Sequence, residues 1–161
     1  MGGRQSALDE TDRGILHMLQ LDARNNRARE IGEAVGVSAS TVRNRIEALE
    51  DEGVIRGYVP KIDYERAGYQ LSILFTCTAN NPSEPLTEDL LEKHGVVSVR
   101  KLLAGRENYH IRVVGTDTND VSNIANSIRE CGLEIVRSEV LDDEYVQPFD
   151  HFGKDVPSGE D

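Results

Sequence analysis

The chain has 161 residues, of which 38% are hydrophobic, and a formal net charge of −11. This length fits one large domain or two small ones, and the apolar content is enough for a packed core. The sequence has no run of about 18 apolar residues, and its first ten residues lack the apolar stretch of a secretory signal. These features exclude a disordered chain, and we expect a cytoplasmic protein without membrane contact.

Acidic residues are concentrated in the C-terminal part of the chain. Residues 1–62 carry nine Lys and Arg against ten Asp and Glu, net −1, whereas residues 63–161 carry nine against nineteen, net −10. The charge of the whole chain disfavours binding to DNA phosphates, but the N-terminal part is nearly neutral. Only four of the 18 basic residues are Lys. Acid excess with Arg favoured over Lys resembles halophilic proteins, and an ordinary acidic mesophilic protein is the alternative.

Two cysteines, Cys77 and Cys131, lie in separate apolar stretches. Neither has a Cys or His at metal-ligand spacing, so we expect no disulfide and no metal site. Both are assigned to the core of the protein.

Two short helices are predicted at the start of the chain. Asp9 can cap a helix over residues 10–21, because apolar residues recur after it at helical spacing. A second helix is predicted over residues 28–35, with Asn25 or Asn26 as its cap.

A third helix follows a three-residue turn. Gly36 permits a left-handed backbone, Val37 can fill the space between the helices, and Ser38 can cap the helix over residues 39–52. A short helix, a glycine turn and a longer helix match a helix-turn-helix, in which the third helix enters the DNA major groove. A plain three-helix bundle with a solvated face is the alternative.

The expected outward face of the third helix carries small polar and Arg side chains. A guanidinium can read guanine and an Asn amide can read adenine, so Arg43 and Asn44 are expected to contact bases. Thr41 and Arg45 flank the apolar stripe and are expected to contact phosphates. The candidate DNA-binding residues are Ser38, Ser40, Thr41, Arg43, Asn44 and Arg45.

The rest of the chain alternates between strand and helix patterns. Residues 54–59 alternate in polarity and predict a linker strand that ends at Pro60. The elements after it are a strand over 71–79, a helix from Ser83 to Gly95, strands over 96–103 and 109–113 joined by a tight turn, a helix from Thr118 or Asn119 to Gly132, and a strand over 133–141.

This βαββαβ order is the ferredoxin-like arrangement of four antiparallel strands with two helices on one face. We therefore predict an α+β protein with a winged-helix-like helix-turn-helix domain over 1–62, a ferredoxin-like effector and dimerisation domain over 63–150, and a disordered acidic tail over 151–161. The open face of the sheet needs a cover, and the simplest cover is the same face of a second copy.

Together the two parts resemble the Lrp/AsnC, or feast/famine, transcription regulators over residues 8 to about 149. The resemblance implies a homodimer joined through the α/β domains, octamers in many relatives, binding to double-stranded promoter DNA, control of amino-acid or nitrogen metabolism genes, and no cofactor. It also suggests a halophilic archaeal source when combined with the acid excess. The residues that carry it are Leu8, Asp9, Asp12, Ile15, Leu16, Val35 to Ser38, Arg43, Arg45, Ile46, Leu49, Gly53, Ile55, Gly57 and Tyr58.

The same resemblance implies a small-molecule effector, an amino acid or a related compound, bound between dimers near the hairpin turn. Many relatives place an acidic residue just before the turn tyrosine, where this chain has Asn108. A carboxylate suits an α-amino group, so Glu107 or Asp117 is the alternative partner. The candidate effector residues are Gly105, Arg106, Glu107, Asn108, Tyr109, Thr116, Asp117 and Ser138.

Two other functions are compatible with this architecture. Sirohaem decarboxylases resemble it and use His and Arg, and His110, beside the candidate pocket, is the one histidine placed to act. No second acid or base accompanies it by spacing, so we expect no enzyme and no catalytic residue. A ligand-sensing module without DNA binding is the other alternative, but it would not need the polar residues of the third helix.

Overall fold

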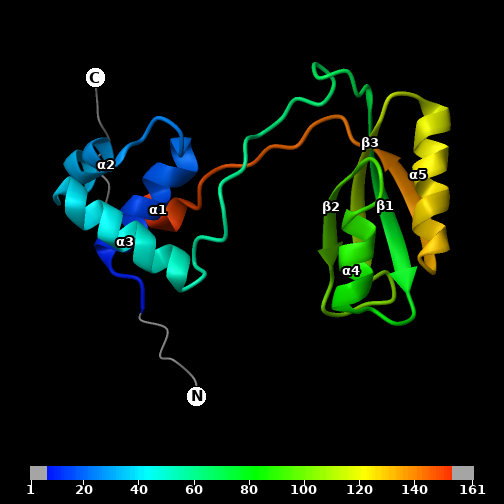
Figure 1. Cartoon of the computed structure of the whole chain (residues 1–161), viewed down its shortest axis with the longest axis horizontal. Helices are drawn as coiled ribbons and strands as arrows, with labels where there is room; N and C mark the ends of the chain where they lie inside the picture. The colour runs from blue at the N-terminus through cyan, green and yellow to red at the C-terminus, as the bar shows by residue number, and fades with distance from the viewer. Residues whose placement is uncertain (1–6, 154–161) are drawn as a thin grey trace. The chain divides into compact units, whose positions relative to one another are not determined.

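The computed structural model describes residues 7–153 and divides them into two compact units (Figure 1). Residues 7–60 and 145–153 form the first unit, and residues 61–144 form the second. The first unit therefore contains two separate stretches of the chain. Residues 154–161 of the expected tail lie outside the described residues, whereas Asp150–Gly153 form a short 3-10 helix, η1.

Three helices form the first unit: α1 (Glu10–Asp22), α2 (Ala28–Val35) and α3 (Ala39–Asp51). Their buried faces meet in one apolar cluster, because the apolar residues of each helix recur at helical spacing. Asp9 and Ser38 cap α1 and α3 as predicted, whereas α2 begins after Arg27, which makes no side-chain cap bond. The buried residues of the cluster are Ile15, Leu16, Ile31, Val42 and Leu49.

Residues 54–59 form no strand, so that part of the prediction is wrong. The amides of Val54 and Ile55 both donate to the carbonyl of Leu49, 2.9 and 3.0 Å away, and so complete the C-terminal turn of α3. Apolar alternation makes a strand only where a second strand lies alongside to accept its backbone hydrogen bonds.

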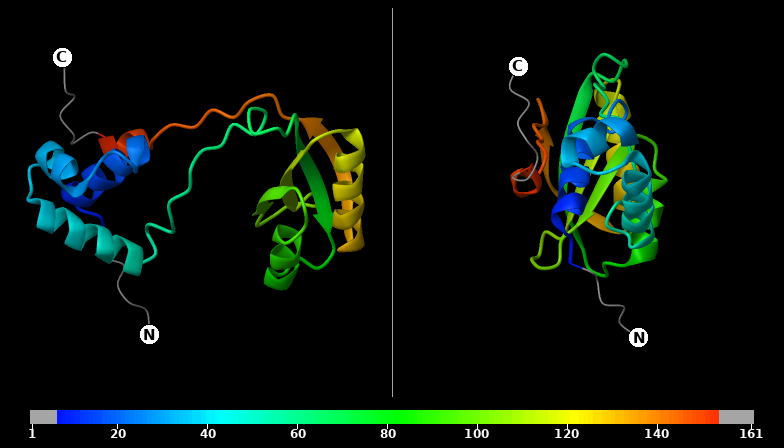
Figure 2. Two further views of the ribbon diagram at one scale, coloured as in Figure 1. Left: turned by 45° about the horizontal axis from the view of Figure 1, so that its top comes forward. Right: turned by 90° about the vertical axis from the view of Figure 1, so that its left-hand side faces the viewer.

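The second unit is a four-stranded antiparallel sheet of order β2-β3-β1-β4 with two helices (Figure 2). The βαββαβ order of its elements along the chain and the strand order of its sheet confirm the predicted ferredoxin-like fold. The elements are β1 (Leu71–Ala79), α4 (Glu84–Leu91), β2 (Val96–Lys101), β3 (Tyr109–Gly115), α5 (Thr118–Glu130) and β4 (Leu133–Val140).

The core of the second unit lies between the sheet and its two helices. Phe75 and Ile111 pair across β1 and β3 and pack with Leu90 of α4 and Ile128 of α5. Cys77, which is fully buried, belongs to this core, and burial raises the pKa of its thiol to about 11. Side chains that alternate with these residues point to the opposite, open face of the sheet.

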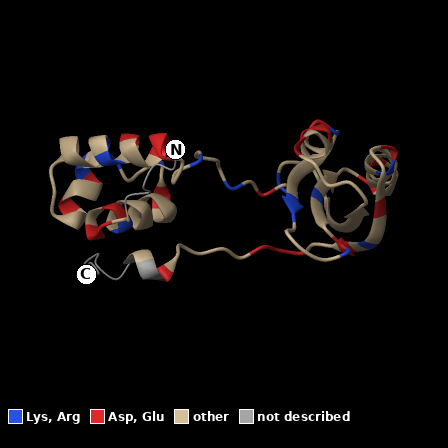
Figure 3. Ribbon diagram, turned by 90° about the horizontal axis from the view of Figure 1, so that it is seen from below, with Lys and Arg blue, Asp and Glu red and all other residues tan. Residues whose placement is uncertain are grey.

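Both units carry charges of both signs on their helices, with acidic residues frequent on the two helices of the second unit (Figure 3). No helix of the described residues is long and apolar enough to cross a membrane. Among the same residues, no cluster of His, Cys, Asp and Glu could hold a metal ion.

Candidate nucleic-acid interface and effector residues

The turn between α2 and α3 is a tight left-handed corner. Gly36 has φ +80°, and the amides of Gly36 and Val37 donate to the carbonyl of Gly32 at 2.9 and 3.0 Å. Residues with a side chain rarely adopt this φ, so the corner requires glycine at position 36. The corner sets the direction in which α3 leaves α2.

Gly32 allows α2 to lie close to this corner. A Cβ atom added at Gly32 would lie 2.5 Å from the carbonyl oxygen of Val37, a backbone atom that cannot move aside. Sequence reasoning missed this requirement, although a glycine inside a helix is itself a signal of close packing.

The first turn of α3 carries a compact group of hydroxyls. Ser38 Oγ accepts a hydrogen bond from the Thr41 amide at 3.1 Å and lies 2.9 Å from Thr41 Oγ1 and 3.2 Å from Ser40 Oγ. Ser38 and Ser40 are exposed, and Thr41 is half-buried. The structure therefore brings these three predicted residues together at the N-terminal end of the helix, where the helix dipole favours anions.

Arg43 and Asn44 lie side by side on the exposed face of α3. Among the described residues, no ion pair or hydrogen bond engages either side chain, so both are available to an external partner. Leu49 and Val42 occupy the opposite, buried face of the same helix. The exposed face thus has hydrogen-bonding groups that can read base edges in a DNA groove.

Arg45 is engaged within the unit. Its Nη1 donates to Asp9 Oδ2 at 2.7 Å and to Asp12 Oδ1 at 3.2 Å, and its side chain is 40% exposed. These contacts link α3 to the start of α1. Sequence reasoning did not find this pair, because the partners are more than thirty residues apart.

In the second unit, the hairpin turn is fastened to β1 by Asn108. Its Oδ1 accepts from the Ala79 amide and its Nδ2 donates to the Ala79 carbonyl, both at 2.8 Å. An amide side chain satisfies both backbone groups at once, which a carboxylate cannot do. Asn108 therefore has a structural role in this chain.

The neighbours of Asn108 are also paired within the unit. Tyr109 is fully buried, with its hydroxyl near Thr87 Oγ1 and the Ser83 carbonyl. Glu107 makes a two-pronged ion pair with Arg137 of β4, at 2.9 and 3.3 Å. Of the hairpin candidates, Gly105 and Arg106 are exposed, and Gly105 has φ +108°.

Thr116 and Asp117 lie at the N-terminal end of α5. Asp117 Oδ1 caps the helix by accepting from the Asp120 amide at 2.8 Å, and Asp120 Oδ2 accepts from the Thr116 amide at 3.0 Å. The hydrogen bond from the Thr116 amide is the largest cause that holds the pKa of Asp120 below its ordinary value, and the nearby His94 lowers this pKa further. Asp117, instead of Thr118 or Asn119, is therefore the cap of this helix.

The two groups of effector candidates lie at opposite ends of one strand. Tyr109 begins β3 and Gly115 ends it, so the hairpin turn and Thr116 are separated by the length of the strand, about 20 Å. Ser138 is exposed on β4 and pairs with Phe75 of β1. One copy of the second unit does not bring these residues together.

The histidines do not form a catalytic group. His110 lies on the open sheet face, His94 Nε2 is 3.3 Å from Asp120 Oδ1, and His17 belongs to α1 of the other unit. The side chain of His151 lies outside those described. Among the hydrogen bonds of residues 7–153, none joins a His to a Ser, Thr or Cys side chain, the contact by which a general base activates a nucleophile.

Comparison with known proteins agrees with this geometry. A family model described as a winged helix-turn-helix DNA-binding domain matches residues 8–56. The transcriptional regulator LrpA of Mycobacterium tuberculosis is 30% identical over 140 residues, which cover 84% of this chain and 90% of LrpA. LrpA of Pyrococcus abyssi is 34% identical over 122 residues, covering 74% of this chain and 84% of that protein.

A solved structure with the same architecture is the feast or famine regulatory protein from M. tuberculosis in complex with L-methionine. It is 26% identical, with a TM-score of 0.76, over 88% of this chain and 96% of that one. The fold and these relatives define a helix-turn-helix transcriptional regulator and not an enzyme, as predicted. The chain belongs to the Lrp/AsnC family.

Proposed function

We propose that this regulator binds double-stranded promoter DNA sequence-specifically by placing α3 in the major groove. The observation that carries the proposal is the exposed pair Arg43 and Asn44, which have no partner among the described residues on a helix whose other face is buried. Arg43 reads guanine and Asn44 reads adenine. The hydroxyls of Ser38, Ser40 and Thr41 contact phosphates at the N-terminal end of the helix.

Arg45 is a positioning residue in this proposal. Its ion pairs with Asp9 and Asp12 fix the angle between α3 and α1, and they neutralise two carboxylates near the DNA-facing helix. A phosphate contact by Arg45 would require it to leave these carboxylates. This differs from the sequence-based expectation, in which Arg45 contacts a phosphate directly.

The test selects binding sites for the full-length chain from a random duplex pool and measures affinity for the selected site and for a scrambled site. Arg43→Ala should cost about 1–3 kcal/mol on the selected site and little on the scrambled one. Arg66→Ala, which removes an equally charged side chain that is 89% exposed in the second unit, is the matched control. Equal losses for Arg43→Ala and Arg66→Ala would reject the assignment.

We further propose that a small molecule of the amino-acid class regulates the protein from a site built by two copies. The support is that one relative is bound to L-methionine and that the candidate residues lie at opposite ends of β3. A hairpin turn from one copy and the α5 cap of another can supply both groups. Arg106 and Glu107 then face the effector from the turn, and Thr116 and Asp117 from the cap.

A panel of amino acids tests this site through the melting temperature, because a ligand that binds only the folded state raises it. The ligand that raises it in the parent protein should lose its effect in Arg106→Ala. Glu92→Ala, an exposed substitution after α4, is the control. No shift with any amino acid would reject this class of effector.

The assembly and setting are part of the same proposal. We propose a homodimer joined through the second unit, with octamers as a higher assembly, that works in the cytoplasm on amino-acid or nitrogen metabolism genes. The acid excess further favours a halophilic source. Light scattering gives the mass of the assembly, and unfolding at rising KCl tests the halophilic origin, because the net charge of −11 predicts greater stability in molar salt than in dilute buffer.

A further inference from the structure

The exposed face of α3 also carries a carboxylate. Glu47 follows Arg43 by four residues and Asn44 by three, so the three side chains lie on adjoining turns of one helix face. All three are exposed, whereas Val42 and Leu49 are buried on the opposite face. Glu47 is not among the candidate DNA-binding residues, and the function proposed above gives it no contact.

Glu47 has no partner within the described part of the chain. No hydrogen bond or ion pair of residues 7–153 engages its side chain, and Arg43, one turn earlier, is likewise unpaired. Spacing is not the reason, because Arg29 and Glu33 have the same spacing and order in α2 and form an ion pair at 3.1 Å. An exposed ion pair of this kind contributes little to stability, so leaving it unmade costs little.

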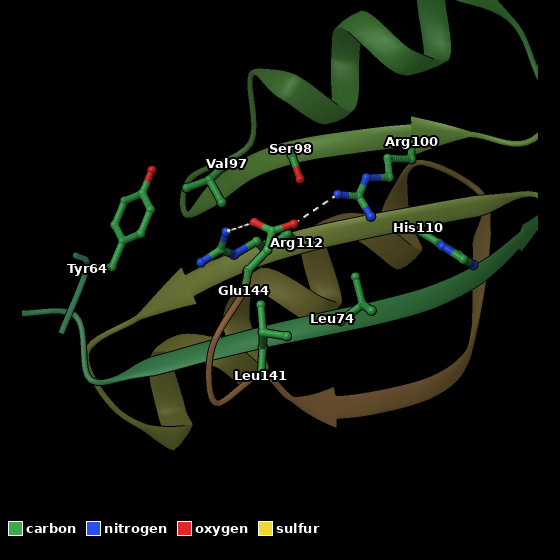
Figure 4. A pocket seen from close by; sticks show the side chains of 9 residues that line it. All are labelled: Tyr64, Leu74, Val97, Ser98, Arg100, His110, Arg112, Leu141 and Glu144. Atoms are coloured by element: carbon green, nitrogen blue, oxygen red, sulfur yellow. Dashed lines mark hydrogen bonds and ion pairs between the residues drawn. The ribbon is translucent and has the colours of Figure 1, made fainter. Parts of the chain in front are cut away.

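Glu144 in the second unit illustrates a carboxylate that is fully engaged by neighbouring guanidinium groups. It accepts hydrogen bonds from Arg100 at 3.2 Å and from Arg112 at 3.1 Å, and Figure 4 shows both side chains directed at it. Glu47 lies one helical turn from a guanidinium without such a contact. Its two carboxylate oxygens are therefore available to an external hydrogen-bond donor.

A carboxylate on a helix that enters the major groove selects among bases. Ionised Glu accepts hydrogen bonds and donates none, so it can pair with the N4 amino group of cytosine. Guanine presents only acceptors there, thymine presents an acceptor and a methyl group, and adenine places the acceptor N7 beside its N6 amino group. Because phosphates repel a carboxylate, Glu47 without a base donor lowers affinity and so disfavours sites that lack cytosine.

We propose that Glu47 is a further specificity-determining residue, which accepts a hydrogen bond from a cytosine amino group in the major groove. This inference rests on the placement of α3 in that groove proposed above. Four residues of α-helix rise about 6 Å, close to two base-pair steps of about 3.4 Å each. The cytosine should therefore lie about two base pairs from the guanine that Arg43 reads.

The test repeats the selection from a random duplex pool with the full-length parent chain and with Glu47→Gln. A Gln amide accepts from N6 of adenine and donates to N7, so the selected base should change from cytosine to adenine at one position. The guanine read by Arg43 should be retained in both selections. A difference confined to one position would show that the carboxylate, and not the overall charge of α3, reads that base.

Four duplexes that differ only at this position then give the Kd values. The parent should prefer cytosine over thymine about tenfold, and Glu47→Gln should prefer adenine over cytosine about tenfold. Glu47→Ala offers neither donor nor acceptor, so its four Kd values should agree within about threefold. Urea unfolding should be unchanged in both variants, because Glu47 is exposed and unpaired among the described residues.

Glu52→Gln is the matched control. Glu52 is the exposed C-cap residue of α3, and five residues separate it from Glu47, which places the two side chains roughly 140° apart around the helix axis. The control removes the same charge from the same helix without changing the face that carries Arg43. It should keep the base preferences of the parent and change all four Kd values by a common factor of at most about threefold.

Three results overturn the proposal. In the first, Glu47→Gln and Glu52→Gln raise affinity for all four duplexes by the same factor, which indicates only weaker repulsion of phosphates. In the second, Glu47→Gln selects the same bases as the parent at every position. In the third, Glu47→Gln relaxes only the guanine preference, which means that it acts through Arg43.

Failure of this proposal is distinguishable from failure of the proposed function. If Arg43→Ala leaves the guanine preference unchanged, the placement of α3 in the groove is wrong, and the role of Glu47 is wrong with it. If Arg43→Ala removes the guanine preference and Glu47→Gln changes no base preference, only the role of Glu47 is wrong.

Discussion

Arg45 of α3 donates a hydrogen bond to Asp9, the residue that caps α1, over 2.7 Å. Asp9 also accepts a hydrogen bond from the Asp12 amide at 2.8 Å. The same carboxylate therefore caps α1 and binds Arg45 of α3. The hydrogen bond from the Asp12 amide is the largest of the causes that hold the pKa of Asp9 below its ordinary value. Arg45 lowers this pKa further, whereas desolvation raises it. The position of α3 is thereby tied to the ionisation of the residue that caps α1.

This arrangement predicts an acid-sensitive coupling between α1 and α3. A lowered pKa in the folded state means that ionised Asp9 stabilises the fold above its unfolded pKa, near 3.8, and that this contribution is lost as pH falls through the folded value. A double-mutant cycle of Asp9→Asn and Arg45→Gln, measured by urea unfolding, should give about 0.5–1 kcal/mol at pH 7 after screening. The coupling should decrease as pH falls below the ordinary pKa of about 3.8, since the carboxylate that Arg45 binds is then progressively protonated.

The control cycle uses Arg29 and Glu33, an ion pair of 3.1 Å within α2 whose side chains are 82% and 68% exposed. Its coupling should not exceed about 0.5 kcal/mol. If the Asp9 and Arg45 cycle gives the same value as this control at pH 7, the pair does not position α3.

Gly32→Ala separates two effects that change the free energy of unfolding in opposite directions, the higher helix propensity of alanine and the clash of its methyl group with Val37. Replacing a helix-interior glycine by alanine ordinarily stabilises a helix by about 1 kcal/mol. Here the added methyl group meets the Val37 carbonyl at 2.5 Å, and forcing the corner apart costs about 1–3 kcal/mol. We expect net destabilisation of the first unit, measured by urea unfolding, and weaker DNA binding through a displaced α3.

Gly36→Ala is the companion variant. A Cβ atom there meets nothing within 4 Å, so its cost is the left-handed backbone alone, about 1–2 kcal/mol. It should destabilise the unit while leaving the packing of α2 against the corner unchanged. If Gly32→Ala proves stabilising, steric contact with Val37 is not what requires glycine in α2.

The local features of the fold could be predicted from the sequence. Caps such as Asp9 and Ser38 act on amides three residues away, and the apolar run over 71–79 identifies a strand without reference to its neighbours. Such features, taken in order, were enough for the helix-turn-helix and the ferredoxin-like sheet. The first turn of α3 was likewise predictable, because Ser38, Ser40 and Thr41 are adjacent in the chain.

The features that escaped prediction depend on distant partners. Asn108 bonds Ala79 and Arg45 bonds Asp9, and nothing in the local pattern marks either pair. The expected strand over 54–59 failed for the same reason, since strand formation needs a neighbour. The packing of Phe152 against the first unit spans the longest separation along the chain of these contacts, because the whole second unit lies between them in the sequence.

Asn108→Asp should destabilise the second unit. The carboxylate would set a second acceptor against the Ala79 carbonyl, in place of the donor at 2.8 Å, and cost about 1–3 kcal/mol at pH 7. The pKa of the new carboxyl is raised, because its neutral form restores a donor. The loss should therefore be complete at neutral pH and shrink as pH falls through the raised pKa.

Asn123→Asp, an exposed change on α5, supplies the control for the altered charge. Thermal unfolding at pH 7 and pH 4 measures both variants. A loss for Asn108→Asp that is no larger than that of Asn123→Asp, or that grows at lower pH, would show that the two Ala79 hydrogen bonds do not depend on the amide.

Phe152→Ala should destabilise the first unit although it lies outside the helix-turn-helix sequence. Phe152 packs against the buried cluster of α1, α2 and α3. Its ring lies edge-on to the ring of Phe149, with 4.9 Å between the two ring centroids. The Phe149 amide also donates to Gln20 Oε1 of α1 at 3.3 Å. Because the ring is half-buried, its removal should cost about 1–2 kcal/mol in urea unfolding.

Val146→Ala, which shortens a side chain that is 69% exposed in the same returning segment, is the matched control and should change stability by less than about 0.5 kcal/mol. The same two variants can be compared in DNA binding. Because α1 supports α3, Phe152→Ala should weaken binding to selected and scrambled sites alike. If it weakens only the selected site, the returning segment takes part in sequence recognition and not in support of the helices.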